Sequence, residues 1–257
     1  MKRFPFLLPL LLLAFTLSGC SSSRTAQNTA PEPAPNVAAD LVARHVAALG
    51  GLEKLQSIQT LKRIGDVRMM GMEMPLVIYQ KRPDKVRTEV EIPSMNMEVI
   101  TAYDGETGWM LNPMMGSDPQ TMTPEQTRNM LNQVDIDGPL VNYEARGITI
   151  EDLGESEAGG KPVRKLRLVR PDGPDVILSL DAETYLVVKS EGPGSDPQTG
   201  ETVTTEVYFS DYRPVEGVMM PHALEVHLRG EKFQDISFTA IVVNPELNDR
   251  LFTMPGK

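Results

Sequence analysis

Cysteine is almost absent from this sequence. Cys20 is the single cysteine among 257 residues, so the chain cannot close an internal disulfide and offers no cysteine pair to a metal or redox motif. An excess of positive charge is lacking too. The formal net charge is −10, and it becomes −12 if residues 1–19 are removed, because Lys2 and Arg3 leave with them. An acidic chain has no electrostatic footprint for nucleic acid, so we expect no such partner.

Recognisable catalytic motifs are also missing. The sequence contains no Gly-x-Ser-x-Gly elbow and no phosphate-binding glycine loop followed by Lys and Ser or Thr. His222 and His227 are five residues apart, which on a strand places them on opposite faces, and His45 stands alone in a predicted helix. The run 135–138 begins like a calcium loop but lacks the remaining ligands. We therefore expect no enzyme, no cofactor and no metal site, although two carboxylates folded into one pocket would permit acid–base chemistry.

Long apolar runs are limited to the amino terminus. Phe4–Leu17 is apolar over fourteen residues apart from Pro5, Pro9 and Thr16, which is too short to span a bilayer and matches the core of a signal peptide. The run ends in Leu-Ser-Gly-Cys20, which resembles the lipobox of bacterial lipoproteins, where the cysteine is acylated and becomes the first mature residue. The alternative is an ordinary secretory signal followed by an incidental cysteine.

The residues after Cys20 predict a disordered tether, because they are rich in Ser, Thr, Ala, Asn and Pro. We expect a signal peptide at 1–19, a lipidated tether at 20–35 and one folded domain at 36–257. Acyl chains on Cys20 would hold the protein to a membrane. Ser21 follows the cysteine, which in Gram-negative bacteria favours sorting to the outer membrane.

Methionine is concentrated in one part of the predicted domain. Eleven of the fifteen methionines lie between Met69 and Met130. The stretch 60–113 predicts a meander of short strands, since in 85–92 the charged residues alternate with apolar or β-branched ones. Any single methionine is better explained as ordinary core. The density favours a sheet face that accepts changeable apolar ligands, because a fixed core is better specified by Leu, Ile and Val.

The rest of the domain predicts a few helices and many strands. Asn36 caps a helix at 37–49 that Gly50-Gly51 ends, a short helical turn follows at 52–58, and Thr123-Pro124 begins a third helix. Further strands are expected at 148–153, 163–169, 175–180, 185–190, 202–212, 218–228 and 233–243, with a polar loop at 192–200. Ten or eleven strands with two or three helices indicate a mostly antiparallel α+β domain.

Three segments of this domain carry a resemblance to a known family. They are Tyr79–Arg87 (YQKRPDKVR), Tyr103–Trp109 (YDGETGW) and Tyr208–Pro221 (YFSDYRPVEGVMMP). Together with the lipobox, the tether and the helix that ends in Gly-Gly, they make the chain similar to the outer-membrane lipoprotein-sorting family, the LolA/LolB-like proteins. The resemblance extends over most of residues 36–257.

The resemblance implies a curved, mostly antiparallel sheet, an incomplete β-barrel, with helices covering its concave face. It also implies a hydrophobic cavity between sheet and helices that binds the acyl chains of lipoproteins or lipids without catalysis. Combined with the strand-face pattern, it predicts a cavity wall. The predicted wall residues are Met70, Met72, Met74, Val86, Val90, Met95, Met97, Val99 and Trp109. Trp109, the single tryptophan, is better explained as core, and lining a ligand cavity is the alternative for it.

These observations predict a monomeric lipoprotein, anchored through Cys20 to the outer membrane and facing the periplasm. Its partners would be acylated lipoproteins or lipids, which it sorts or transfers. Two alternatives stay open at this point. The first is an envelope interaction or sensor protein that uses the same fold to bind a protein partner, and the second is an enzyme, which would need converging polar groups in a pocket.

Overall fold

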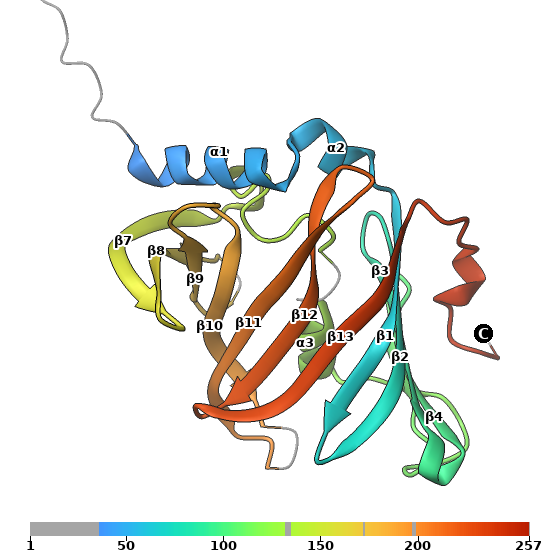
Figure 1. Ribbon diagram of the computed structural model, residues 1–257. Helices are drawn as coiled ribbons and strands as arrows, with labels where there is room; N and C mark the ends of the chain where they lie inside the picture. Colours follow the sequence, from blue (N-terminus) through green and yellow to red (C-terminus); the bar gives the residue numbers. More distant parts are fainter. Residues whose placement is uncertain (1–35, 132–134, 172, 197–198, 257) are drawn as a thin grey trace, which may run out of the picture. The chain divides into compact units, whose positions relative to one another are not determined.

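The computed structural model describes residues 36–131, 135–171, 173–196 and 199–256. Cys20 and the predicted signal peptide and tether lie outside the described residues. Asn36–Lys257 forms one compact unit, and everything below concerns this domain (Figure 1). Among its described residues, no helix is both long and apolar enough to cross a bilayer.

Two helices open the domain, as the sequence predicts. Helix α1 spans Val37–Leu49, and the Asn36 side chain accepts a hydrogen bond from Ala39 N at 3.2 Å, which caps its first turn. Gly50 ends the helix with a φ of 118°. A Cβ atom at Gly50 would lie 2.3 Å from the carbonyl oxygen of Gly217, so the close approach also requires glycine. Helix α2 then covers Leu52–Ser57.

The domain is dominated by a single antiparallel sheet that does not close into a barrel. Its strand order is β6-β5-β4-β3-β2-β1-β13-β12-β11-β10-β9-β8-β7, so β6 and β7 are the edges. The strands are β1 Thr60–Met69, β2 Met72–Lys81, β3 Lys85–Ile92, β4 Met97–Tyr103, β5 Gly108–Leu111, β6 Gln120–Thr121, β7 Thr149–Ala158, β8 Lys161–Val169, β9 Val176–Asp181, β10 Val187–Ser195, β11 Thr202–Val215, β12 Val218–Leu228 and β13 Glu231–Val243. The α+β class with an incomplete barrel is confirmed, and the described sheet has more strands than expected.

The predicted loop at 192–200 is partly wrong. Strand β10 continues through Gly192 and Gly194 and pairs with β11 as far as Ser195 opposite Thr202. A Cβ atom at Gly194 would lie 2.2 Å from the hydroxyl oxygen of Thr205 on β11. The glycines therefore permit close packing of neighbouring strands, and they do not mark a loop.

The third helix and three short 3₁₀ turns complete the described elements. Helix α3 spans Pro124–Leu131, and Thr123 and Gln126 exchange capping hydrogen bonds of 2.8 and 3.2 Å, as expected for this start. The 3₁₀ turns are η1 Pro93–Met95, η2 Glu144–Arg146 and η3 Asp249–Leu251. Helices α1 and α2 lie across one end of the sheet, and α3 lies behind β12 and β13 in Figure 1.

Candidate functional site

All three helices pack on the same face of the sheet, which we call the inner face. Leu41 and Val42 of α1 pack against the β8 and β9 side chains of one core cluster. Met130 of α3 packs on Val86 of β3. Strand residues alternate between the two faces, so the cross-strand neighbours Leu76 and Val90 also point to the inner side. The opposite, outer face carries the charged residues of β3.

The end of the inner face under α1 and α2 is filled with apolar side chains. Its buried members are Leu49, Leu55, Ile58, Leu61, Val141, Leu186, Val218 and Met220. They come from both helices, from the segment after α3, and from β1 and β12, so helix and sheet share one core here. Helices α1 and α2 therefore cover the buried side chains at this end, although eight further apolar residues packed against them are only partly buried.

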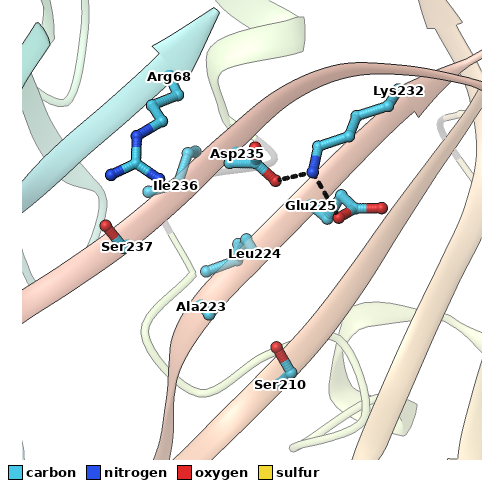
Figure 2. Close-up of a pocket in the computed structure, with 9 residues that line it drawn as sticks. All are labelled: Arg68, Ser210, Ala223, Leu224, Glu225, Lys232, Asp235, Ile236 and Ser237. Carbon is cyan, nitrogen blue, oxygen red and sulfur yellow. Dashed lines mark hydrogen bonds and ion pairs between the residues drawn. The ribbon is translucent and has the colours of Figure 1, made fainter. Parts of the chain in front are cut away.

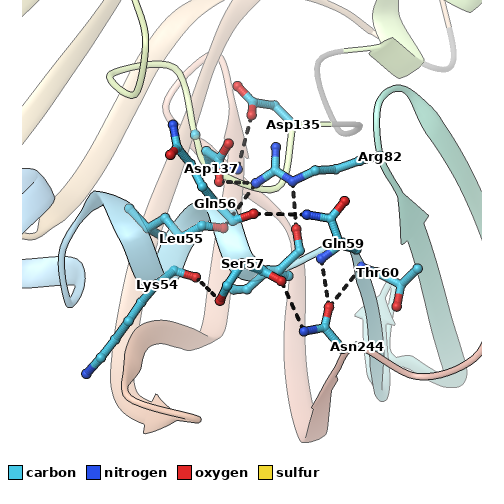
Figure 3. Close-up of polar contacts among 12 residues, drawn as sticks. Lys54, Leu55, Gln56, Ser57, Gln59, Thr60, Arg82, Asp135, Asp137 and Asn244 are labelled. Carbon is cyan, nitrogen blue, oxygen red and sulfur yellow. Dashed lines mark hydrogen bonds and ion pairs between the residues drawn. The ribbon is translucent and has the colours of Figure 1, made fainter.

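A polar network fastens this covered end (Figure 3). Arg82, just after β2, donates to the carbonyl oxygens of Ile58 at 2.6 Å and Leu55 at 3.2 Å, and it pairs with Asp137. Asn244, just after β13, accepts from Gln59 N at 2.7 Å and donates to the Ser57 carbonyl at 3.1 Å. The end of α2 is thereby joined to both neighbouring strands.

The other end of the inner face is built by strands and strand ends alone. We call it the open cluster. Its buried members are Val67, Met74, Leu76, Ile92 and Phe238, and its partly buried members are Met69, Ile78, Val90, Met97, Val99, Leu224, Ile236 and Ile241. None of these described residues belongs to a helix. A sheet usually buries its apolar face against another layer, and at this end the described structure leaves eight apolar side chains partly exposed.

The structure brings four of the nine predicted wall residues into the open cluster, namely Met74, Val90, Met97 and Val99. Val86 shares their face but is fully buried, in the cluster that contains Met130 of α3. Met70 is 70% exposed in the β1–β2 turn, Met95 is 53% exposed in η1, and Met72 is 41% exposed at the start of β2. These three therefore lie at the rim of the predicted wall.

Trp109 is not brought together with the others. It pairs with Ala102, and Ala102 pairs with Arg87, so all three side chains lie on the outer face. The indole Nε1 donates to the carbonyl oxygen of Phe252 at 2.7 Å, and Met254 packs in the same cluster. The C-terminal segment therefore buries Trp109 completely as outer-face core. The charged residues of β3, which alternate with apolar ones, were the sequence signal that this face is the outer one.

Arg63 on β1 is an inner-face residue that the sequence reasoning missed. Its cross-strand partners are Ile78 and Ile241, both in the open cluster. Its guanidinium carbon lies 5.8 Å from the ring centre of Phe238, a cation–π distance. This partly buried, apolar setting lowers the pKa of Arg63 to about 10 through desolvation, so the group stays charged at neutral pH. The alternation of 61, 63, 65 and 67 in β1 already indicated this face.

A pocket of about 320 Å³ lies between β12 and β13, and its charged residues lie on the outer face (Figure 2). It is lined by Arg68, Ser210, Ala223, Leu224, Glu225, Lys232, Asp235, Ile236 and Ser237. Lys232 forms ion pairs with Glu225 at 2.9 Å and Asp235 at 2.6 Å, and Arg68 pairs with Glu73. The charged groups are thus paired with one another, and a polar pocket of this kind does not suit an acyl chain.

The side chains that could serve in catalysis or metal binding form ion pairs and hydrogen bonds within the described part of the chain. No group of three or more His, Cys, Asp or Glu side chains in its described part is placed to hold a metal ion. Asp135 pairs with Arg146 at 2.5 Å and Asp137 with Arg82, so both carboxylates of the run 135–138 form ion pairs. Burial lowers the pKa of His45, whose Nδ1 lies 2.8 Å from the Tyr185 carbonyl oxygen. This ring links α1 to the segment before β10.

Comparisons by sequence give no family. No family model matches the chain, and no curated protein matches it either.

Solved structures do resemble the domain. A domain from Vibrio parahaemolyticus named for outer membrane lipoprotein sorting matches with a TM-score of 0.56 and 12% identity over 83% of this chain and 94% of that one. A LolA superfamily protein from Nitrosomonas europaea gives a TM-score of 0.55 and 14% identity over 84% and 97%. A DUF1329 family protein from Desulfovibrio piger gives 0.57 and 13% over 84% and 97%. At these identities the likeness concerns the fold, which is LolA-like.

Proposed function

We propose that this protein, whose domain has the LolA-like fold, holds the acyl chains of lipoproteins or lipids against the open cluster on the inner face of its sheet. The observation that carries the proposal is that eight of the thirteen members of this cluster are only partly buried and no described helix contributes to it. The protein binds and releases its ligand without catalysis. The domain named for lipoprotein sorting shares the fold, which supports the same assignment by analogy.

The affinity would come from removing apolar surface from water. Each buried methylene contributes roughly 0.8 kcal/mol, so ten buried methylenes gain roughly 8 kcal/mol before the cost of ordering the chain. Methionines at 69, 74 and 97 suit this task because their thioether side chains adapt to chains of different length and saturation. Release is then possible without breaking any specific polar bond in this cluster.

Acylation of Cys20 would complete the proposed role. Two or more acyl chains would keep the protein at a membrane, and an envelope location on the periplasmic side of the outer membrane would place the ligands within reach. The negative net charge makes a covalent anchor useful, since the chain is repelled by anionic lipid headgroups. Mass spectrometry of the mature N-terminus tests this part separately.

The binding face is tested by Met97→Asp. A carboxylate placed in the open cluster would have to be desolvated by a bound chain, so we expect binding of a fluorescent fatty-acid probe to fall at least about ten-fold. Met115→Asp is the matched control, because Met115 is 63% exposed and lies outside the cluster. Circular dichroism verifies that both variants fold. Equal binding by both variants would place the ligand elsewhere.

The ligand class is tested by purification. We would express residues 24–257 in a periplasm, purify the protein without detergent and identify bound small molecules by mass spectrometry. Stoichiometric acylated species are the expected result. An empty protein that also ignores the fatty-acid probe would contradict the proposal and favour a protein partner.

A further inference from the structure

Among the described residues of the inner face, Arg63 is a charged side chain that no ion pair neutralises. Arg63 lies between the covered end and the open cluster, since its partner Ile241 packs against both clusters. Its inner-face neighbours along the strand are Leu61 and Gly65, and across the strands they are Ile78 and Ile241. All four are apolar or lack a side chain. Phe238 lies under the guanidinium.

Within the described part of the chain, no carboxylate, carbonyl or hydroxyl group forms a hydrogen bond or ion pair with the Arg63 side chain. Other arginines near the inner and outer faces are paired: Arg82 with Asp137, Arg87 with Glu89 and Arg164 with Asp152. Placing a guanidinium among apolar side chains without a partner costs folding free energy. An apolar residue at this position would avoid that cost.

We propose that Arg63 anchors the anionic group, a carboxylate or a phosphate, of an acyl amphiphile whose hydrocarbon chain lies on the open cluster. This inference rests on the proposed function and adds the polar end of the ligand to it. The planar guanidinium matches two oxygens of a carboxylate or phosphate in a forked pair of hydrogen bonds. The low polarity of its surroundings strengthens that pair, because little water competes for the same donors.

The position also gives the ligand a direction. The covered end beyond Arg63 is filled by α1, α2 and the segment after α3, whereas the open cluster extends from Ile78 and Ile241 toward Met74, Met97 and Ile92. An anionic group held at Arg63 therefore leaves its chain one free apolar direction. Neutral amphiphiles would use the same apolar surface without the anchor.

The test compares three amphiphiles with the same twelve-carbon chain: dodecanoate, dodecyl phosphate and dodecanol. Binding is measured by displacement of the neutral probe N-phenylnaphthylamine from residues 21–257, produced without the leader so that no acyl group is attached. We expect the wild type to prefer at least one of the two anions over dodecanol by ten-fold or more. The stronger of the two anions identifies carboxylate or phosphate as the source.

Arg63→Met should abolish this preference by weakening the binding of the anions, and it should raise the melting temperature, because the variant no longer buries an unpaired charge. Arg63→Lys keeps the charge but not the forked donors, so it should retain part of the preference. Arg68→Met is the control on the same strand, where the arginine is exposed and paired with Glu73. It should leave the preference intact.

The outcomes separate this inference from the proposed function. If the wild type binds dodecanol and both anions equally, and Arg63→Met changes nothing, the acyl-binding role stands and the anchor is wrong. If none of the three amphiphiles displaces the probe from the wild type, both the anchor and the acyl-binding role are wrong. A lower melting temperature for Arg63→Met would also overturn the anchor, since it would show a structural role for the arginine.

Discussion

The two faces of this sheet differ in how their charged side chains are paired. On the outer face, Lys189 forms ion pairs with Glu191 at 3.0 Å and with Glu206, and its ammonium lies 5.3 Å from the ring centre of Tyr208. On the inner face, Arg63 has the Phe238 ring and apolar neighbours. Paired charges on a solvated face cost little, whereas Arg63 has no ion-pair partner among the described residues and is costly to bury.

The Arg82–Asp137 pair at the covered end is expected to stabilise the fold. The Asp137 side chain is 8% exposed, so Arg82→Ala leaves a nearly buried carboxylate and two backbone carbonyls without their donor. We expect the free energy of unfolding to fall by about 2–4 kcal/mol. Urea denaturation followed by circular dichroism measures it.

Arg146→Ala is the comparison for this prediction. Arg146 pairs with Asp135 at 2.5 Å, but the two side chains are 42% and 25% exposed. Its removal should cost about 1 kcal/mol or less. Equal losses for the two variants would mean that Arg82 does not fasten α2 and its neighbouring segment.

Among the elements, the C-terminal segment is a cover for the outer face. Phe252 is fully buried and its carbonyl accepts the Trp109 indole, while η3 supplies Asp249 to Lys81 at 2.7 Å and Lys85 at 2.9 Å. The apolar contacts of Phe252 and Met254 and the two ion pairs therefore hold one short segment on β2, β3 and β5. Part of each face of the sheet is thus covered, the inner face by helices at one end and the outer face by this segment.

This segment is expected to respond to acid. Hydrogen bonds from Lys81 and Lys85 lower the pKa of Asp249 to about 2, from an ordinary value of 3.8. The folded-state pKa is depressed, so the ion pairs stabilise the folded chain above about pH 4 and are lost as the pH falls toward about 2. Because Trp109 is the single tryptophan, its fluorescence reports the release of the segment.

Asp249→Asn removes the titrating group and serves as the control. Its emission at pH 5 should already resemble that of the acidified wild type, and it should change less between pH 5 and pH 2. A wild-type emission that stays constant over this range while the far-ultraviolet circular dichroism is unchanged would contradict the prediction.

For the whole molecule, an open sheet leaves edges that must avoid pairing with other chains. Edge strand β7 carries Glu151, Asp152, Glu155 and Glu157 and is interrupted by a bulge between Asp152 and Gly154. Charges and bulges on an edge oppose the addition of a further strand. This arrangement is consistent with the expected monomer.

Removing acidic residues from edge strand β7 is expected to make the protein associate. The double variant Glu155→Val and Glu157→Val exposes β-prone side chains on the free edge, so we expect dimers or aggregates by light scattering where the wild type stays monomeric. Glu53→Val and Glu246→Val, two acidic residues outside strands, form a control of equal charge change. If the control variant associates to the same extent, the change in net charge and not the exposed edge causes the association.

Much of the fold was predictable because its signals are local. The bounds of α1, the capping box of α3 and the bounds of β12 follow from caps, turns and alternation within a few residues. The extension of β10 was missed because Gly192, Pro193 and Gly194 disfavour strands locally. Only pairing with β9 and β11 makes that segment a strand.

Local signals in the sequence were enough to predict a sheet-dominated domain, the bounds of α1 and an apolar alternation rich in methionine, and the segment that ends in Cys20 resembles a lipobox. The tertiary structure decided which apolar residues stay uncovered, because that depends on where helices and the C-terminal segment lie after folding. It placed Trp109 on the outer face under Phe252 and Arg63 on the inner face above Phe238. Periodicity fixes which residues share a face, but only long-range packing fixes what covers that face.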